Sequence, residues 1–130
     1  AKTKVKIGTI SNADVYGFKN YCEADAPNVT LKEGEVISID EDNELEIRFV
    51  PGHAPGHIVF INHKDKYVIN GDCLFMGSIG RTDLPGGNHE QLLESIKREL
   101  FSLPDDYTVY CGHGPETTIG HEKQHNPFLN

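Results

Sequence analysis

The sequence predicts one domain of the α/β class, in which a sheet carries helices on one face. Two observations predict this class. Several short apolar runs of strand length come first, and a helical pattern, another strand and a second helix follow them. The length of 130 residues fits a single domain, and 37% hydrophobic with 25% charged residues suits a globular protein. We therefore expect residues 1–130 to form one layered α/β or α+β domain.

The first half of the chain predicts strands and one loop. Residues 4–10 alternate polar and apolar side chains and predict a strand, whereas residues 11–31 have no clear period and predict a loop. Two strand pairs follow, each joined by a short polar turn: residues 35–40 with 44–50, and residues 58–62 with 67–70.

The second half predicts a long loop and two helices. Residues 71–87 are rich in glycine, and a loop of that length in a compact domain is usually functional. A helix is predicted over residues 88–101, with Asn88 as its N-cap. A strand at 107–110 and a short helix at 117–124 complete the pattern. The apolar residues of the longer helix recur at helical spacing and predict one buried face: Leu92, Leu93, Ile96 and Leu100.

The composition limits the partners and the compartment. A formal net charge of −8 and a pI near 5.2 argue against nucleic acid or an anionic membrane as the main partner. There is no signal peptide and no apolar stretch long enough to cross a membrane. The three cysteines, Cys22, Cys73 and Cys111, form no C-x-x-C pair, so we expect a reducing cytoplasm and no disulfide framework. We interpret Cys73 and Cys111 as buried thiols in preference to metal ligands or redox-sensitive groups.

Three short motifs each place a possible metal ligand just after a strand-like run. They are Pro51-Gly52-His53, Asn70-Gly71-Asp72 and Cys111-Gly112-His113. Loops at the carboxyl ends of neighbouring strands are where α/β sheets hold ligands. Two imidazoles and a carboxylate brought together there would form half of a metal site. Each residue alone also fits an ordinary turn, so the prediction depends on the three occurring together.

Three residues near these motifs have two possible roles each. His57, four positions after His53, either supports the metal ligands or has a plain structural role. Arg81 and Asp83, in the glycine-rich loop, either contact a substrate anion or pair with each other and brace the loop.

A separate motif, His121-Glu122-Lys123-Gln124-His125, matches the H-E-x-x-H helix signature of zinc proteases. Such a protease needs a third ligand, usually well downstream, but only five residues follow His125. Asn126-Pro127 also ends the helix at once. We therefore interpret this segment as a solvent-exposed terminal helix.

From about Val36 to its end, the chain resembles the metallo-β-lactamase superfamily, specifically the glyoxalase II-like hydrolases. The most specific segments are Gly71–Asp83, Cys111–Pro115 and Thr118–Glu122. The resemblance implies an αββα sandwich, of which this chain would form the C-terminal half, with a mixed sheet and helices on one face. It also implies a site at one edge of the fold for one or two metal ions, usually zinc and sometimes iron or manganese.

The same resemblance assigns the ligands. His53 would bind the first metal, His113 would bind the second, and Asp72 would bridge them. Family members also carry an H-x-H-x-D-H cluster in their N-terminal half, but no two histidines of this sequence are two positions apart. We therefore expect that half of the fold to be absent, with residues 4–10 as an inner strand. Metal binding should be weak, because a tight zinc site needs about four ligands.

The implied reaction is hydrolysis by a hydroxide that the metals hold and that attacks a carbonyl, such as that of a hydroxyacylglutathione thioester. We expect this chain alone to have little or no turnover. The missing sheet would expose apolar surface, so we also expect self-association or pairing with an N-terminal half. The alternatives are an iron-dependent persulfide dioxygenase of the same superfamily and a non-catalytic, oligomerising module with a vestigial metal site.

Overall fold

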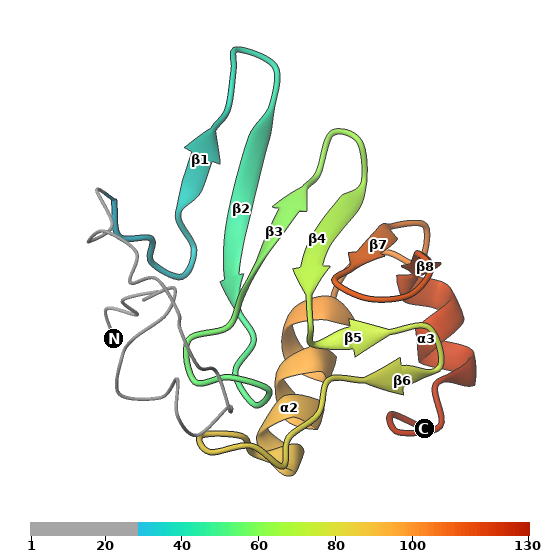
Figure 1. Ribbon diagram of the computed structural model, residues 1–130. Helices are drawn as coiled ribbons and strands as arrows, with labels where there is room; N and C mark the ends of the chain where they lie inside the picture. The colour runs from blue at the N-terminus through green and yellow to red at the C-terminus, as the bar shows by residue number, and fades with distance from the viewer. Residues whose placement is uncertain (1–28) are drawn as a thin grey trace. The chain divides into compact units, whose positions relative to one another are not determined.

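The structure is a computed structural model that describes residues 29–130 (Figure 1). The elements described below belong to one compact unit, Glu33–Asn130. The strand expected at 4–10 and most of the loop expected at 11–31 lie outside the described residues. Within residues 29–130, every helix is too short and too polar to cross a membrane.

Six strands form one mixed sheet in the order β1-β2-β3-β4-β7-β8 (Figure 1). β4 and β7 pair in parallel, and all other neighbours pair antiparallel. The two predicted hairpins are confirmed, although the first strand has three residues instead of six. The strands are β1 (Val36–Ser38), β2 (Glu44–Phe49), β3 (Ile58–Asn62), β4 (Tyr67–Gly71), β7 (Thr108–Cys111) and β8 (Thr117–Thr118).

The pairing directions decide where the loops meet. β2 and β4 run in the same direction because each is antiparallel to β3, and β7 is parallel to β4. The carboxyl ends of β2, β4 and β7 therefore lie at the same edge of the sheet. The three candidate ligand motifs follow these three ends.

The glycine-rich segment after β4 is not the unbroken loop that the sequence predicts. It contains a small hairpin of β5 (Leu74–Phe75) and β6 (Ser78–Ile79). Gly77 in its turn has a φ of 67°, a left-handed conformation that glycine adopts without strain. Glycine here therefore marks a tight turn, and the remaining loop runs only from 80 to 88.

The long predicted helix is confirmed, but in two parts: α2 (His89–Ser95) continues into η1 (Ile96–Leu100), a π-helical stretch. Asn88 is the N-cap, and its side chain accepts a hydrogen bond of 3.0 Å from the Gln91 amide. The predicted start of the last helix is wrong. Residues 117–118 form β8, where β-branched threonines fit a strand, and α3 (Ile119–His125) begins after Thr118 as N-cap.

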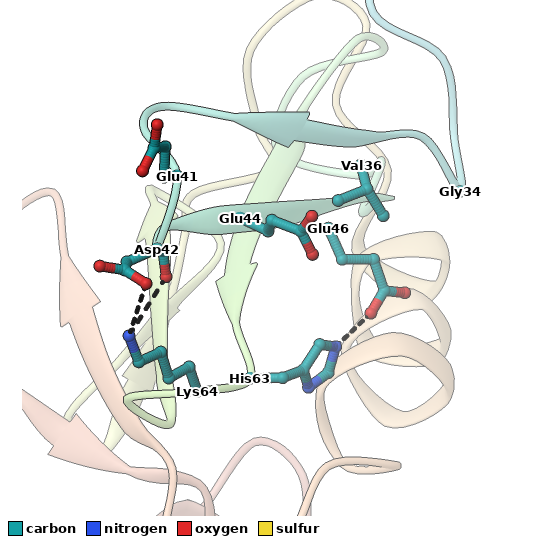
Figure 2. A pocket seen from close by; sticks show the side chains of 8 residues that line it. All are labelled: Gly34, Val36, Glu41, Asp42, Glu44, Glu46, His63 and Lys64. Carbon is teal, nitrogen blue, oxygen red and sulfur yellow. Dashed lines mark hydrogen bonds and ion pairs between the residues drawn. The ribbon is translucent and has the colours of Figure 1, made fainter.

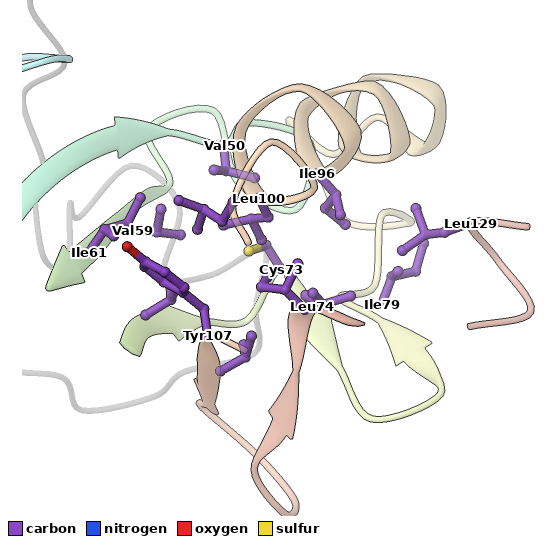
Figure 3. Packing of buried hydrophobic residues seen from close by; sticks show 14 of the residues in the cluster. Val50, Val59, Ile61, Cys73, Leu74, Ile79, Ile96, Leu100, Tyr107 and Leu129 are labelled. Atoms are coloured by element: carbon purple, nitrogen blue, oxygen red, sulfur yellow. The ribbon is translucent and has the colours of Figure 1, made fainter. Parts of the chain in front are cut away.

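The core lies between the sheet and the helices (Figure 3). Leu92, Ile96 and Leu100 recur every four residues along α2 and η1, and all three are fully buried. Leu93 is only partly buried and packs against the edge of this cluster. The helices meet a row of β-branched side chains on one face of the sheet: Val59, Ile61, Val68 and Val109.

Candidate metal centre

The structure brings His53, Asp72 and His113 together at the shared sheet edge. The carboxylate of Asp72 lies between the two imidazoles. Its Oδ2 is 4.0 Å from His53 Nε2, and its Oδ1 is 2.9 Å from His113 Nδ1. The side chain of His113 is largely exposed, whereas that of His53 is about one-fifth exposed. Each oxygen of one carboxylate therefore faces a different histidine.

Two glycines allow this close approach. A Cβ atom at Gly112 would lie 2.2 Å from Asp72 Oδ1. One at Gly80 would lie 1.9 Å from the Asp72 carbonyl oxygen and 3.3 Å from the Cβ of His53. Neither position has room for a side chain, so the glycines around the motifs shape the site.

The Arg81 backbone fixes the orientation of His53. His53 Nδ1 lies 2.8 Å from the Arg81 carbonyl oxygen. Because a carbonyl only accepts, Nδ1 must donate, and this assigns the lone pair of His53 to Nε2, the nitrogen nearest Asp72. Metal-binding histidines commonly donate their second nitrogen to such an oxygen.

His57 packs against His53 and hydrogen-bonds to the end of β4. Its Nε2 donates to the Asn70 carbonyl oxygen at 2.9 Å, and its ring meets that of His53 edge-on, with centroids 6.0 Å apart. Burial lowers the pKa of His57, and the hydrogen bond to Asn70 opposes this shift only in part. His57 thus lies where a supporting residue would lie, behind His53.

Arg81 and Asp83 pair with each other, which was one of their two predicted roles. Arg81 Nε lies 2.8 Å from Asp83 Oδ1, and a second guanidinium nitrogen lies 2.9 Å from Oδ2. The hydrogen bond from Arg81 lowers the pKa of Asp83 to about 2. This exposed fork braces the loop next to His53.

The two described cysteines are thiols. Cys73 is fully buried and donates to the side-chain oxygen of Asn70 at 2.6 Å. Burial raises the pKa of Cys73 and, to a lesser extent, that of the partly buried Cys111. A metal ligand would be a thiolate. Their environments therefore favour the protonated form.

The donor set fits metal ions only in part. Within residues 29–130, no three His, Cys, Asp or Glu side chains are arranged to hold one ion. The distances show why, because the imidazoles of His53 and His113 approach opposite oxygens of Asp72 instead of a common point. This arrangement suits a carboxylate that bridges two ions, with one histidine for each. Imidazole and carboxylate fit zinc or iron, but each ion would lack further protein ligands.

The family model described as "Metallo-beta-lactamase superfamily" matches residues 2–113. The chain belongs to this superfamily. Its fold confirms the predicted class, a mixed sheet with helices. Superfamily members bind metal ions, and all three candidate ligands of this chain lie within the matched region.

Known members of the superfamily resemble the chain over most of its length. It is 52% identical over 99 residues to "Hydroxyacylglutathione hydrolase GloC" from Haemophilus influenzae, covering 76% of this chain and 46% of the relative. "BLEG-1 B3 metallo-beta-lactamase" superposes with a TM-score of 0.82 at 38% identity, covering 92% of this chain and 56% of that one. "TTHA1623 in a di-iron-bound form" superposes with a TM-score of 0.78 at 39% identity, covering 92% of this chain and 57% of that one. The chain thus spans about half the length of the superfamily members it matches.

Two sets of contacts near the motif segments are not evident from the sequence. Phe75 meets the ring of His113 edge-on, with centroids 6.1 Å apart. Glu122 is fully buried and accepts a hydrogen bond of 3.0 Å from the Gly77 amide, which ties α3 to the hairpin that carries Phe75. Phe75 and Glu122 both lie in segments that carry the resemblance to the superfamily, but only the fold shows what these two residues contact.

An open cavity of about 550 Å³ lies at the opposite end of β2 and β3 from the metal centre (Figure 2). Its two basic side chains already pair with acidic side chains of the lining. His63 contacts Glu46, and Lys64 Nζ lies 3.9 Å from Asp42. No predicted site residue lines the cavity, so it is separate from the candidate centre. Its lining residues are Gly34, Val36, Glu41, Asp42, Glu44, Glu46, His63 and Lys64.

Proposed function

We propose that His53, Asp72 and His113 form half of the dinuclear metal site of a hydrolase. The observation that carries the proposal is the carboxylate of Asp72, set between the nitrogens of two histidines at one sheet edge. The substrate class we propose is a thioester such as a hydroxyacylglutathione. The name of the 52% identical relative supports this class.

Each residue has a defined part in this proposal. Asp72 would bridge two ions, and His53 and His113 would each bind one. The Arg81 carbonyl keeps His53 in the tautomer whose Nε2 lone pair would be free to bind an ion. When bound, zinc would supply a Lewis acid that polarises a carbonyl and lowers the pKa of water. The di-iron-bound structural neighbour supports iron as the alternative metal.

We further propose that this chain alone binds metal weakly and has little or no turnover. Two histidines and one shared carboxylate provide too few ligands for two ions. The polypeptide that completes the fold would supply the others. A cytoplasmic location completes the proposal, supported by the free thiols of Cys73 and Cys111.

Zinc titration with two readouts tests these statements. We expect zinc to raise the melting temperature of the chain without producing hydrolysis of S-lactoylglutathione. Asp72→Asn should lower the zinc-induced rise, whereas Asp106→Asn, an exposed carboxylate paired with Lys66, should leave it unchanged. An identical zinc response in Asp72→Asn would refute the site, and rapid turnover by the chain alone would refute its inactivity. Oxygen consumption with glutathione persulfide by an iron-loaded, completed protein would favour the dioxygenase alternative.

A further inference from the structure

Helix α3 carries two exposed histidines one turn apart, away from the candidate metal centre. His121 and His125 are four residues apart and therefore share one face of the helix. Their rings are stacked, with centroids 4.7 Å apart and planes inclined by 25°. Both side chains are exposed to solvent.

The hydrogen bonds of these two histidines leave ring nitrogens available to bind a ligand. His125 Nδ1 lies 3.1 Å from the His121 carbonyl oxygen and must donate to it, so the lone pair of neutral His125 is on Nε2. His121 Nε2 lies 3.9 Å from Glu122 Oε1, which is beyond hydrogen-bond length. Glu122 therefore does not hold the His121 ring by a hydrogen bond.

The contacts of Glu122 distinguish this segment from the H-E-x-x-H helix of a zinc protease. Its Oε1 accepts from the Thr117 hydroxyl at 2.6 Å, and its Oε2 accepts from the Gly77 amide at 3.0 Å and from Asn126 Nδ2 at 2.8 Å. A fully buried carboxylate with these three donors is not placed to act as a general base. Its negative charge still lies beside His121 and favours a bound cation.

We propose that His121 and His125 form a bidentate surface site for a divalent transition metal such as Cu²⁺ or Zn²⁺. Imidazole nitrogens suit these ions, and water would complete the coordination. Two nitrogens on one tetrahedral zinc are about 3.3 Å apart, so the two stacked rings would have to rotate until their lone pairs meet at one ion. The site shares no residue with His53, Asp72 and His113, so it stands or falls independently of the proposed function.

Copper titration of the full chain, followed by electron paramagnetic resonance, tests the site. The double variant His53→Ala/His113→Ala removes the candidate centre and leaves the pair on α3. In that background we expect one bound Cu²⁺ with two imidazole nitrogens. Adding His125→Gln should leave one imidazole nitrogen and weaken binding about ten-fold or more, because the chelate is lost. His89→Gln is the matched control, since His89 is exposed on α2 and has no histidine four residues away.

A second measurement on the unmodified chain does not depend on the folding of any variant. Zinc should shift the imidazole ¹⁵N resonances of both residues in long-range ¹H–¹⁵N spectra. The His121 and His125 signals should move over the same range of zinc concentration. Unshifted signals for the two histidines, or equal copper affinity with and without His125→Gln, would overturn the site.

Discussion

Asp72 meets more constraints than any other residue of the candidate centre. Its side chain faces two histidines, and its backbone and carboxylate occupy the space that side chains at Gly80 and Gly112 would fill. The position of the Asp72 carboxylate thus depends on the absence of a side chain at Gly80 and Gly112. A single added methyl group should move it.

We expect Gly112→Ala to weaken zinc binding about ten-fold, in the range typical of residues that orient metal ligands. The added Cβ would lie 2.2 Å from Asp72 Oδ1, so the carboxylate must shift and its contact with His113 must change. Isothermal titration with zinc measures the effect. Gly114→Ala is the control: its φ of 75° makes the variant strained by about 1 kcal/mol, but no atom lies within 4 Å of the new methyl group. Equal zinc affinities for the two variants would contradict this account.

Glu122 is a second single residue with a testable role, in this case in the stability of the fold. We expect Glu122→Gln to lower the free energy of unfolding by about 1–3 kcal/mol, because the amide nitrogen replaces one acceptor oxygen. It would then face either the Thr117 hydroxyl or the donors of Gly77 and Asn126. Urea unfolding measures the change. Glu116→Gln, at an exposed position just before β8, should change stability by less than about 0.5 kcal/mol. A neutral Glu122→Gln would show that the buried carboxylate is not needed.

At the scale of elements, helix α2 fixes the loop that carries His53. The Asn88 amide donates to the Gly52 carbonyl oxygen at 2.7 Å, and the Leu92 backbone lies directly against Gly52. The first turn of α2 therefore sets the backbone position of the residue just before the candidate ligand.

We expect Gly52→Ala to cost about 1–3 kcal/mol more than Gly34→Ala. Both glycines have positive φ, but a Cβ at Gly52 would lie 2.4 Å from the Leu92 backbone, whereas one at Gly34 would touch nothing within 4 Å. The difference between the two variants isolates the collision with the helix. Chemical unfolding of both proteins provides it, and equal costs would mean that α2 moves away freely.

The elements also show what the sequence predicts well. The periodic hairpins and the buried stripe of α2 follow from side-chain patterns of two and about four residues, which survive in the folded chain. The β5–β6 hairpin and β8 were missed because strands of two residues carry no period. The meeting of His53, Asp72 and His113 was predictable because each ligand follows a strand. The buried network of Glu122 was not, since its partners lie in segments distant along the chain.

At the scale of the whole unit that the structure describes, α2 and η1 pack on one face of the sheet, and the opposite face carries exposed apolar side chains. Ile69 of β4 and Tyr110 of β7 are register partners, and they are 45% and 47% exposed. Val68 and Val109, their neighbours in sequence, point into the core. We propose that the polypeptide that completes the superfamily fold packs on this face, and that copies of the chain associate there in its absence.

Light scattering coupled to size-exclusion chromatography tests this association. We expect the chain to elute as a dimer or larger species, and Ile69→Lys/Tyr110→Lys to shift it toward the monomer mass of 14.5 kDa. Met76→Lys, which alters an equally exposed side chain on the β5–β6 turn, should not. A stable monomer of the unaltered chain at high concentration would refute the proposal.

The parallel pairing of β4 and β7 has a consequence for the order in which the chain acquires its centre. Asp72 and His113 are 41 positions apart, and the intervening crossover includes α2 and η1. Closing so long a loop carries an entropic cost that local contacts do not offset until the helices dock. We therefore expect the candidate ligands to meet late in folding, so that metal binding at this sheet edge would show that the chain has reached its complete topology.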